Sequence, residues 1–406
     1  MKKINIYKAV TACTFASVLL CSMSSCTDGF QEANRPGTGA SLEDLSRDNY
    51  QTSSFLVQME NEAFPEQENA YQMNEDLIGN YLGRYMTYAN NGFAEKNFAR
   101  LNAPNGWVRY PFKDSMTKTV SAFKAIDNVT KGEGPVYAWA LILRAQSFMR
   151  LTDMYGPLPI GADATDGNAY SSQEDVYKSI IADLNKATDV IKPLVASNPN
   201  VTIAEELDKV YQGKMAKWLK YANSLKLRIA IRIRYVEPTL AKQLGEQAVQ
   251  DGVITSNDDN CAIAYTPNGQ YKTSVEWGDS RACADLESYL TGYNDPRLTK
   301  FFKPTEEAGN RAIIGCRAAA KIGNKTTAGK AYSAANIKID SKGVWLTASE
   351  MAFCRAEGAL AGWSNMGGSA KDLYEEGVKL SFEQWGAGSA TAYLADNTST
   401  EKNYVD

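Results

Sequence analysis

The sequence contains no histidine. Histidine is the side chain whose ordinary pKa lies closest to neutral pH, and it is the base in Ser-His-Asp and Cys-His catalysis. Its absence excludes both of those mechanisms, together with zinc sites that use imidazole ligands. An enzymatic function would therefore have to use other side chains, such as a pair of carboxylates.

Long hydrophobic runs are also missing, apart from one at the N-terminus. Residues 9–20, "AVTACTFASVLL", follow three lysines and are too few to span a bilayer with margin. The small residues Ser24 and Ser25 come shortly afterwards, directly before Cys26. This pattern is typical of an exported N-terminus, so we expect residues 1–25 to be a signal peptide. No apolar stretch of about eighteen residues follows, which excludes a further membrane-spanning helix.

The position of Cys26 resembles the cysteine of the bacterial lipoprotein box, where the thiol after the cleavage site is acylated. Cys21 is a competing position, but Leu20 before it is a poor residue for cleavage. The alternative is an ordinary signal peptide with an incidental cysteine. We expect Cys26 to anchor the chain to a membrane, because several acyl chains together give firm attachment. Residues 26–40 contain Gly, Asn and Pro and are expected to be a tether.

The charge balance is mildly acidic. The full chain has 43 basic and 47 acidic side chains, and removal of residues 1–25 takes away three lysines and no acid. The remaining net charge is about −7, whereas proteins that bind phosphate backbones need a basic surface. We therefore expect no nucleic-acid partner. A hydrophobic content of 44% is enough for a substantial core in a chain of 406 residues.

Four of the seven cysteines lie beyond the anchor, at Cys261, Cys283, Cys316 and Cys354. Their wide spacing contains no C-x-x-C motif, which excludes zinc ribbons and thioredoxin-like chemistry. Export permits disulfides, while buried free thiols are the alternative, and the sequence does not choose between them. The stretch "SNDDN" at 256–260 clusters oxygen donors but lacks the spacing of a calcium loop, so a polar turn is favoured. We expect no cofactor and no metal.

Amphipathic helices dominate most of the chain. Helical periodicity occurs in residues 71–88, 111–130, 135–155, 172–192 and 205–234. The segment 135–155 is apolar on nearly all sides and should be buried. Consecutive helices with short connections pack as antiparallel hairpins. The absence of a fixed 34-residue repeat excludes a regular tetratricopeptide array but leaves a degenerate, TPR-like stack open.

Capping boxes mark three helix starts, at Ser172, Thr347 and Ser369, each with an acidic residue three positions later. The spacing of the tyrosines in 71–88 predicts that Tyr81 and Tyr85 lie in the core.

Residues from about 251 to 345 differ from the helical remainder. Gly, Asn, Thr and Lys become more frequent, and short runs such as "CAIAY" and "NIKI…VWL" suggest strands. The "DSKG" segment at 340–343 fits a hairpin loop between the two halves of the second run. We expect an irregular insert on a helical scaffold, where recognition loops are usually found.

A basic run extends from Lys209 to Arg234. It contains five lysines and three arginines and no acidic residue. One interpretation is a patch for a partner or an anionic ligand. The other, which we favour, is a solvated helix face whose side-chain stems cover the core.

One segment, "AWALILRAQSFMRLTDMYGPLPI" at 138–160, combines a buried helix with an abrupt stop. Gly156 allows the helix to end, and Pro157 and Pro159 prevent it from resuming. The segment resembles the signature of the SusD-like (SusD/RagB) nutrient-binding outer-membrane lipoproteins of Bacteroidota. Further similar blocks follow in order: "VYKSIIADLNKATDVI" (176–191), "GKMAKWLKYANSLKLRIAIRI" (213–233), "NDPRL" (294–298), "LTASEMAFCRAEGALAGW" (346–363) and "YEEGVKLSFEQWG" (374–386).

The resemblance implies a mostly α-helical, TPR-like scaffold of helical hairpins over residues 41–406, with the irregular insert as part of one domain. It also implies a lipid-anchored protein of the outer membrane and cell surface. Such a protein acts as the lid of a SusC-like TonB-dependent transporter and presents a glycan or another oligomeric nutrient. The sequence stops at Asp406, earlier than its relatives usually do, so either a C-terminal part is missing or this is a short member.

A binding protein of this kind needs no catalytic residues, which agrees with the missing histidine. A peptide or another nutrient in place of the glycan remains an alternative. A surface glycosidase with paired carboxylates is a further alternative, because the sequence has enough acidic residues to form such a pair.

Aromatic rings are the side chains to examine in a sugar binder, because sugar C–H faces pack on flat rings while polar side chains bind the hydroxyls. The candidates in loop-like surroundings are Trp107, Tyr110, Tyr271, Trp277, Tyr289 and Tyr293. Asn268, Asp279 and Arg281 lie close to them in the sequence and are candidates for polar contacts. Each ring also has a purely structural alternative, since large aromatic side chains are mostly buried.

Overall fold

The computed structural model describes residues 50–160, 169–305, 307 and 313–396. The described residues from Gln51 onward form one compact unit. The predicted signal peptide, the predicted tether and the predicted anchor Cys26 lie outside the described residues. Within the described residues, no helix is both long enough and apolar enough to cross a membrane.

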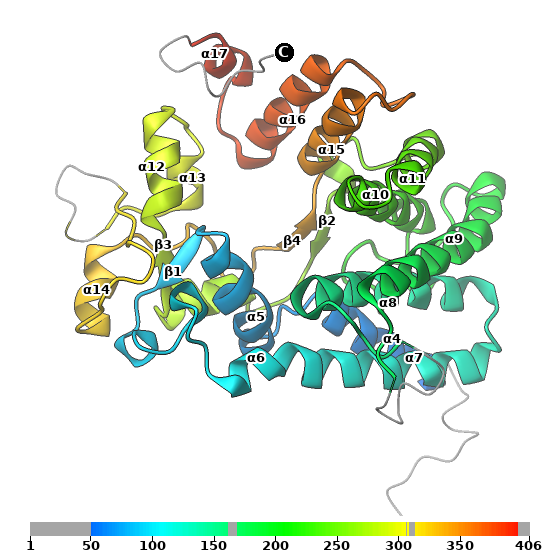
Figure 1. Ribbon diagram of the computed structural model, residues 1–406, viewed down its shortest axis with the longest axis horizontal. Coiled ribbons are helices and arrows are strands. Elements are labelled where there is room, and N and C mark those ends of the chain that lie inside the picture. The colour runs from blue at the N-terminus through cyan, green and yellow to red at the C-terminus, as the bar shows by residue number, and fades with distance from the viewer. Residues whose placement is uncertain (1–49, 161–168, 306, 308–312, 397–406) are drawn as a thin grey trace, which may run out of the picture. The chain divides into compact units, whose positions relative to one another are not determined.

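The described unit is mostly helical, as predicted (Figure 1). Its α-helices are α4 (Tyr50–Ala63), α5 (Glu68–Tyr71), α6 (Asn105–Pro111), α7 (Thr117–Thr130), α8 (Gly134–Tyr155), α9 (Gln173–Ser197), α10 (Met215–Ile233), α11 (Pro238–Asp251), α12 (Ala284–Gly292), α13 (Leu298–Phe301), α14 (Lys325–Ala331), α15 (Ala348–Leu360), α16 (Ala370–Trp385) and α17 (Ala390–Ala395). Its strands are β1 (Met86–Tyr88), β2 (Cys261–Ile263), β3 (Ser280–Ala282) and β4 (Gly343–Leu346). Short 3₁₀ and π-helical segments include η2 (Gln72–Asn80), η6 (Asn257–Asp259) and η7 (Tyr271–Glu276).

Helical hairpins form the scaffold. Helix α8 packs along α9, α10 along α11, and α15 along α16, and α10 also contacts α9 and α15 (Figure 1). Short connections between consecutive helices favour this antiparallel packing. The helical hairpins predicted from the amphipathic periodicity are therefore confirmed.

The main core lies between α4, α8 and α10. Trp139 on α8 and Trp218 on α10 are fully buried, with ring centroids 5.7 Å apart. Tyr221 packs edge-on against Trp218 at 5.4 Å, and Phe64 after α4 packs edge-on against Tyr221 at 6.0 Å. Edge-to-face packing places the positive edge of one ring on the negative face of another. The buried helix predicted for 135–155 is confirmed, since residues from Tyr137 to Leu143 are all buried.

The ends of the helices follow the predicted local signals. The hydroxyl groups of Ser172, Thr347 and Ser369 each accept a hydrogen bond from the backbone N–H three residues later, which satisfies a free donor in the first turn. Helix α8 ends at Tyr155, and Gly156 follows with a φ of 74°, a conformation that favours glycine.

Two antiparallel two-stranded sheets lie in and beside the irregular insert. Strand β1 pairs with β3, and β2 pairs with β4. The predicted hairpin around "DSKG" is wrong, because β4 pairs with the distant "CAI" segment instead. This longer-range pairing buries Cys261, Ile263 and Leu346 in the main core, and burial of apolar surface outweighs the local turn preference.

The helix predicted for 71–88 is shorter than expected. Helical structure ends before Gly83, where a turn with Arg84 at a φ of 58° leads into β1. Tyr81 lies in a buried cluster, as predicted. The prediction for Tyr85 is wrong, because the turn moves this residue off the helix face and leaves its side chain 57% exposed.

Candidate functional site

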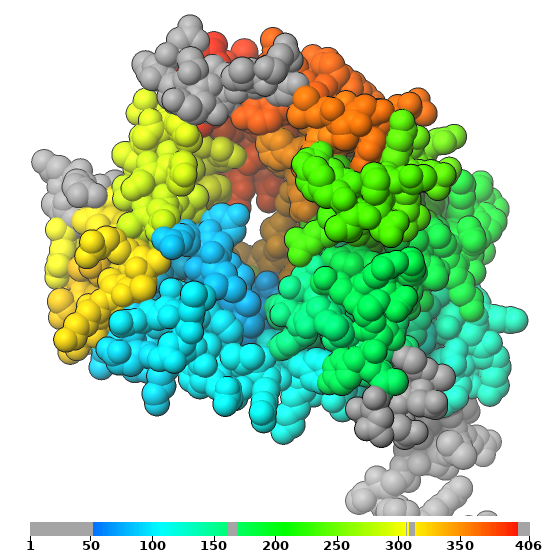
Figure 2. All heavy atoms as spheres, viewed as in Figure 1, coloured from blue at the N-terminus to red at the C-terminus, as the bar shows by residue number. Residues whose placement is uncertain are grey.

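A cavity of about 540 Å³ lies where the insert meets the helical scaffold. Its walls come from the end of η2, the turn before β1, helices α12 and α13, strand β4 and the end of α16. Figure 2 shows an opening in this region, between the blue segment that precedes β1 and the orange-brown segment that contains β4. The lining combines aromatic, aliphatic and amide side chains, which is typical of small-molecule sites.

Three aromatic side chains in this lining carry the main feature of the site. Trp385, at the end of α16, packs edge-on against Phe301 of α13, with centroids 4.7 Å apart and planes at 79°. The contact orients the indole, yet Trp385 remains 40% exposed. Tyr85 is more exposed still and lines the same cavity. Exposed rings held in position by neighbours offer flat apolar surfaces to a ligand.

Neutral polar groups accompany the rings. Four carboxamide side chains line the cavity, from Asn80, Gln270, Asn336 and Gln384. Each carboxamide has both donors and an acceptor, as hydroxyl groups of a ligand require. No aspartate or glutamate occurs among the described residues that line this cavity.

A second cavity, of about 520 Å³, adjoins the first. Lys342, Val344 and Gln384 line both cavities, so the two are continuous along β4 and the end of α16. The rest of its wall comes from the loop before α10 and the segment 257–264.

The loop before α10 is fixed by one buried carboxylate. Asp208 Oδ1 accepts hydrogen bonds from the backbone N–H groups of Val210 and Tyr211 at 2.8 and 2.9 Å. Its Oδ2 accepts from the Gly213 N–H and from Trp218 Nε1, both at 2.7 Å. Four donors on one carboxylate hold this wall of the second cavity against the main core.

Glu60 lies next to this carboxylate, and its Oε2 accepts a hydrogen bond from the backbone N–H of Lys209 at 3.2 Å. Burial, followed by the negative charge of Asp208, raises the pKa of Glu60 well above its ordinary value. The neutral form of Glu60 is therefore favoured in the folded protein.

The predicted residues Asp279 and Arg281 are used inside the fold. Asp279 is buried and accepts hydrogen bonds from Gln72, Asn90 and Lys325 at 3.0, 2.8 and 2.6 Å. Arg281 lies on β3 and donates to the backbone oxygens of Ser274 and Ser280. These contacts join the insert to the N-terminal segment.

Three further residues that were predicted to contact a ligand lie at or near the ends of η7. Asn268 precedes it, Tyr271 is its first residue and Trp277 directly follows it. Asn268 is buried, and its side chain accepts from the Tyr271 N–H and donates to the Ser341 oxygen. Trp277 is half-buried, with the ammonium group of Lys272 5.5 Å from its ring centre. The Asn268 side chain is therefore used inside the fold, and the Trp277 ring contacts the charge of Lys272.

Trp107 and Tyr110 were predicted in a loop, but both lie on α6. The "NGWVRY" stretch forms a short helix whose first turn is closed by hydrogen bonds from the Trp107 and Val108 N–H groups to the Pro104 oxygen. Trp107 packs edge-on against Phe93 at 5.1 Å and is half-buried.

Tyr289 and Tyr293 lie at the C-terminal end of α12, with ring centroids 6.1 Å apart. Tyr289 is 64% exposed. Leu286, one turn earlier on the same helix, lines the first cavity, but the two tyrosines do not. None of the nine predicted ligand-binding residues is therefore part of the cavity lining, and their role in binding stays a prediction.

Sequence reasoning missed Tyr85, Phe301 and Trp385. The feature of the sequence that could have pointed to Trp385 is its position directly before Gly386, which ends α16 in the left-handed conformation. A large ring at the last residue of a helix is often exposed on one side. The contact with Phe301 bridges two helices far apart in the sequence and has no local signature.

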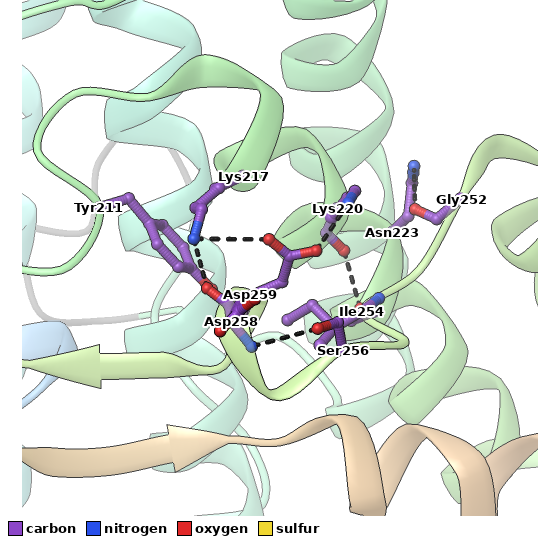
Figure 3. A network of polar contacts seen from close by, with 10 residues as sticks. Tyr211, Lys217, Lys220, Asn223, Gly252, Ile254, Ser256, Asp258 and Asp259 are labelled. Carbon is purple, nitrogen blue, oxygen red and sulfur yellow. Dashed lines mark hydrogen bonds and ion pairs between the residues drawn. The ribbon is translucent and has the colours of Figure 1, made fainter. Parts of the chain in front are cut away.

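The basic run is only in part a solvated face. Lys226 is buried, and burial lowers its pKa to about 8. Arg228 forms two hydrogen bonds to the Glu350 carboxylate, at 2.6 and 2.7 Å, and so connects α10 to α15. Lys217 and Lys220 both face Asp259, at 3.5 and 2.6 Å (Figure 3).

The "SNDDN" stretch forms the predicted polar turn. It contains the short helix η6, and the Ser256 hydroxyl accepts from the Asp258 N–H (Figure 3). Among the described residues, no group of three or more Cys, Asp or Glu side chains is arranged to hold a metal ion. The four described cysteines are free, and burial raises the pKa of Cys283 and Cys316 to about 11. Of the two possibilities left open by the sequence, disulfides or free thiols, the structure has free thiols.

Comparison with known proteins identifies the fold. The family model "SusD-like: Susd and RagB outer membrane lipoprotein" matches residues 32–406. A crystal structure of a SusD-like protein from Bacteroides thetaiotaomicron VPI-5482 is 34% identical, with a TM-score of 0.78, over 86% of this chain and 73% of that chain. A SusD homolog from Bacteroides uniformis ATCC 8492 is 33% identical, with a TM-score of 0.79, over 87% and 74%.

A chitin-binding SusD homolog from Flavobacterium johnsoniae is 32% identical, with a TM-score of 0.78, over 86% of this chain and 73% of that chain. A search of curated proteins gave no match. The family model covers most of the sequence, and the structural matches share the helical scaffold described above. The chain belongs to the SusD-like family of Susd and RagB outer membrane lipoproteins.

Proposed function

We propose that this protein binds an oligosaccharide in the first cavity and presents it, at the cell surface, to a SusC-like TonB-dependent transporter. The observation that carries the proposal is the pair of exposed rings, Trp385 and Tyr85, at one cavity lined with carboxamides. Sugar rings place their C–H faces on aromatic faces, and their hydroxyl groups exchange hydrogen bonds with amide side chains. Both kinds of group are present within about 540 Å³, a volume suited to a few sugar units.

The electrostatics of the cavity support binding over hydrolysis. A glycosidase of the usual kind needs two carboxylates on either side of the scissile bond, whereas the described lining residues include none. Burial raises the pKa values of Glu66 and Asp76 to about 7. A raised pKa alone does not make a general acid, because both groups are buried outside the cavity lining.

Glycan as the ligand class is supported by one relative, the chitin-binding homolog of Flavobacterium johnsoniae. Membrane attachment is supported by the sequence around Cys26 and by the family, whose members are outer membrane lipoproteins. A peptide remains the second candidate ligand, because peptide sites also use aromatic walls.

The ligand-binding test compares alanine variants at the cavity with variants at the positions predicted from sequence. Calorimetry and affinity electrophoresis across a panel of glycans and peptides would first identify a bound ligand. We expect Trp385→Ala to weaken its binding by about tenfold or more, because the stacking surface is lost. Trp107→Ala and Trp277→Ala are matched controls, since each removes a half-buried indole outside the cavity.

The opposite pattern would contradict the assignment. If Trp107→Ala or Trp277→Ala abolished binding and Trp385→Ala did not, the ligand would bind at the surface predicted from sequence. If peptides bound and no glycan did, the ligand class would be wrong. Thermal and urea unfolding of each variant checks that lost binding does not reflect lost folding.

The anchor and the partner require separate measurements. Mass spectrometry of the protein from membranes should find acyl groups on Cys26, and Cys26→Ala should release the protein from the membrane fraction. Affinity purification from solubilised outer membranes should recover a TonB-dependent transporter. An unmodified N-terminus in a freely soluble protein would contradict the lipid anchor.

A further inference from the structure

The second cavity is lined by several lysines, whereas the first has one charged side chain among its described lining residues, the shared Lys342. Its charged lining residues are Lys209, Lys214, Lys217, Lys342 and a single carboxylate, that of Asp258. Because Lys217 is paired with Asp259, the excess of positive charge comes from the other three ammonium groups against the Asp258 carboxylate, in a chain that is acidic overall. Like charges gathered in one concave site raise the free energy of the empty protein, and an anion relieves this repulsion.

Most of these lysines have ammonium groups that can still bind a ligand. Lys217 is committed to the fold, because it faces Asp259 and the Asp258 carbonyl oxygen (Figure 3). The Lys209 ammonium lies 5.1 Å from the ring centre of Tyr265, a contact that leaves its hydrogen-bond donors available. Lys214 and Lys342 have exposed side chains.

The backbone that carries these lysines is held in place. Lys209 and Lys214 lie on the loop fixed by the buried Asp208 carboxylate. The backbone of Lys214 also forms an isolated antiparallel β-bridge with Thr202. Lys214 directly precedes the first turn of α10, whose N-terminus adds partial positive charge. Lys342 directly precedes β4, which is paired with β2. The charges are therefore presented by ordered elements on opposite walls.

Acidic groups near the cavity offset only part of this charge. Glu205 and Glu206 line a third cavity that shares Lys209, Gln212 and Ala264 with the second, so their charge acts mainly on Lys209. The charge of Asp208 is compensated by its four N–H donors. Asp258 lies in the lining of the second cavity and Asp259 pairs with Lys217, whereas no ion pair occurs for Lys214 or Lys342 among the described residues.

We infer that the second cavity is an anion subsite and that the ligand is an acidic oligosaccharide. Its neutral part stacks on Trp385 and Tyr85, and a carboxylate or sulfate group on a neighbouring sugar binds Lys214 and Lys342. A single ligand reaches both places because the cavities share Lys342, Val344 and Gln384. The inference rests on the proposed function and narrows its ligand class.

The test measures binding of four kinds of oligosaccharide by calorimetry. Chitin oligomers are neutral, and polygalacturonate oligomers carry carboxylates only. Chondroitin sulfate is compared with enzymatically desulfated chondroitin. We expect at least one acidic ligand to bind more tightly than the neutral one, and its affinity to fall as salt rises. The double variant with Lys214→Gln and Lys342→Gln should lose about tenfold in affinity for that ligand. Lys371→Gln, which removes one exposed lysine at the start of α16, is the matched control.

The arms of the experiment separate the possible failures. Tighter binding of polygalacturonate assigns the anion as a carboxylate, and a preference for chondroitin sulfate over its desulfated form assigns a sulfate. If neutral and acidic ligands bind equally, or if the double variant binds acidic ligands as the unaltered protein does, the anion subsite is wrong while oligosaccharide binding stands. If no oligosaccharide in a broad panel binds, the proposed function itself is wrong.

Discussion

Replacement of Asp208 by asparagine tests whether one buried carboxylate holds the wall of the second cavity. The carboxylate accepts four hydrogen bonds, two on each oxygen, from Val210, Tyr211, Gly213 and Trp218. Asparagine keeps one of the two oxygens and replaces the other by an NH₂ group. Two of the four donors then face another donor, and two charge-assisted hydrogen bonds are lost.

The magnitude follows from these contacts. A hydrogen bond to a charged group contributes about 1.5–3 kcal/mol, so the loss of two lowers the free energy of unfolding by about 3–6 kcal/mol. Removal of the Asp208 charge also eases ionisation of Glu60, whose pKa this charge raises. That relief is a smaller gain, because burial is the first cause of the raised pKa of Glu60.

Urea unfolding measures the effect, with far-UV circular dichroism and tryptophan fluorescence as probes. Trp218 donates to Asp208, so its emission should report the local change. Glu205→Gln is the matched control, because it removes the same charge from an exposed side chain on the same loop. If Asp208→Asn and Glu205→Gln unfold at the same urea concentration, the four hydrogen bonds do not stabilise the loop as described.

Three further predictions concern pH, packing and binding. Burial raises the pKa values of Glu66 and Asp76 to about 7, so the neutral forms of these two groups favour the folded state. The free energy of unfolding should therefore fall by about 3 kcal/mol per group between about pH 4 and pH 7. Urea midpoints that rise over this range would contradict the assignment. A methyl group on Gly245 would lie 2.4 Å from the Trp363 ring, so Gly245→Ala should lower the free energy of unfolding by about 1–3 kcal/mol, measured by urea unfolding. Tyr85→Ala should weaken oligosaccharide binding severalfold in calorimetry, while Tyr85→Phe keeps most of the affinity because it keeps the ring; equal losses would show that the hydroxyl is the binding group.

The helical scaffold could be predicted because its signals are local. The starts at Ser172, Thr347 and Ser369 and the end of α8 before Gly156 follow from capping chemistry within a few residues. The buried α8 follows from the unbroken apolar character of 135–155. The helical periodicity gave a wrong prediction for Tyr85, because a turn at Gly83 ends the helix before this residue.

The cavity could not be predicted, because its walls meet only in the folded chain. Tyr85, Phe301 and Trp385 come from three segments that are far apart in the sequence. Loop-like surroundings were a poor guide to accessibility: Trp107 lies on a helix and packs against Phe93. The pairing of β4 with β2 was missed for the same reason, since a local hairpin loop is visible in a sequence and a partner eighty residues away is not.

That pairing has a consequence for how this protein diversifies. The chain leaves the scaffold at Ile263 and returns at Gly343, and these two residues are directly opposite each other in the sheet. The two ends of the span 263–343 are therefore held side by side by the sheet, while β3 and Asp279 also join the span to residues 72–90. For a flexible loop inserted between paired ends, each doubling of the length costs only about 0.6 kcal/mol in closure entropy. Loops within the span can thus change in length while α16, which carries Gln384 and Trp385 of the first cavity, keeps its sequence.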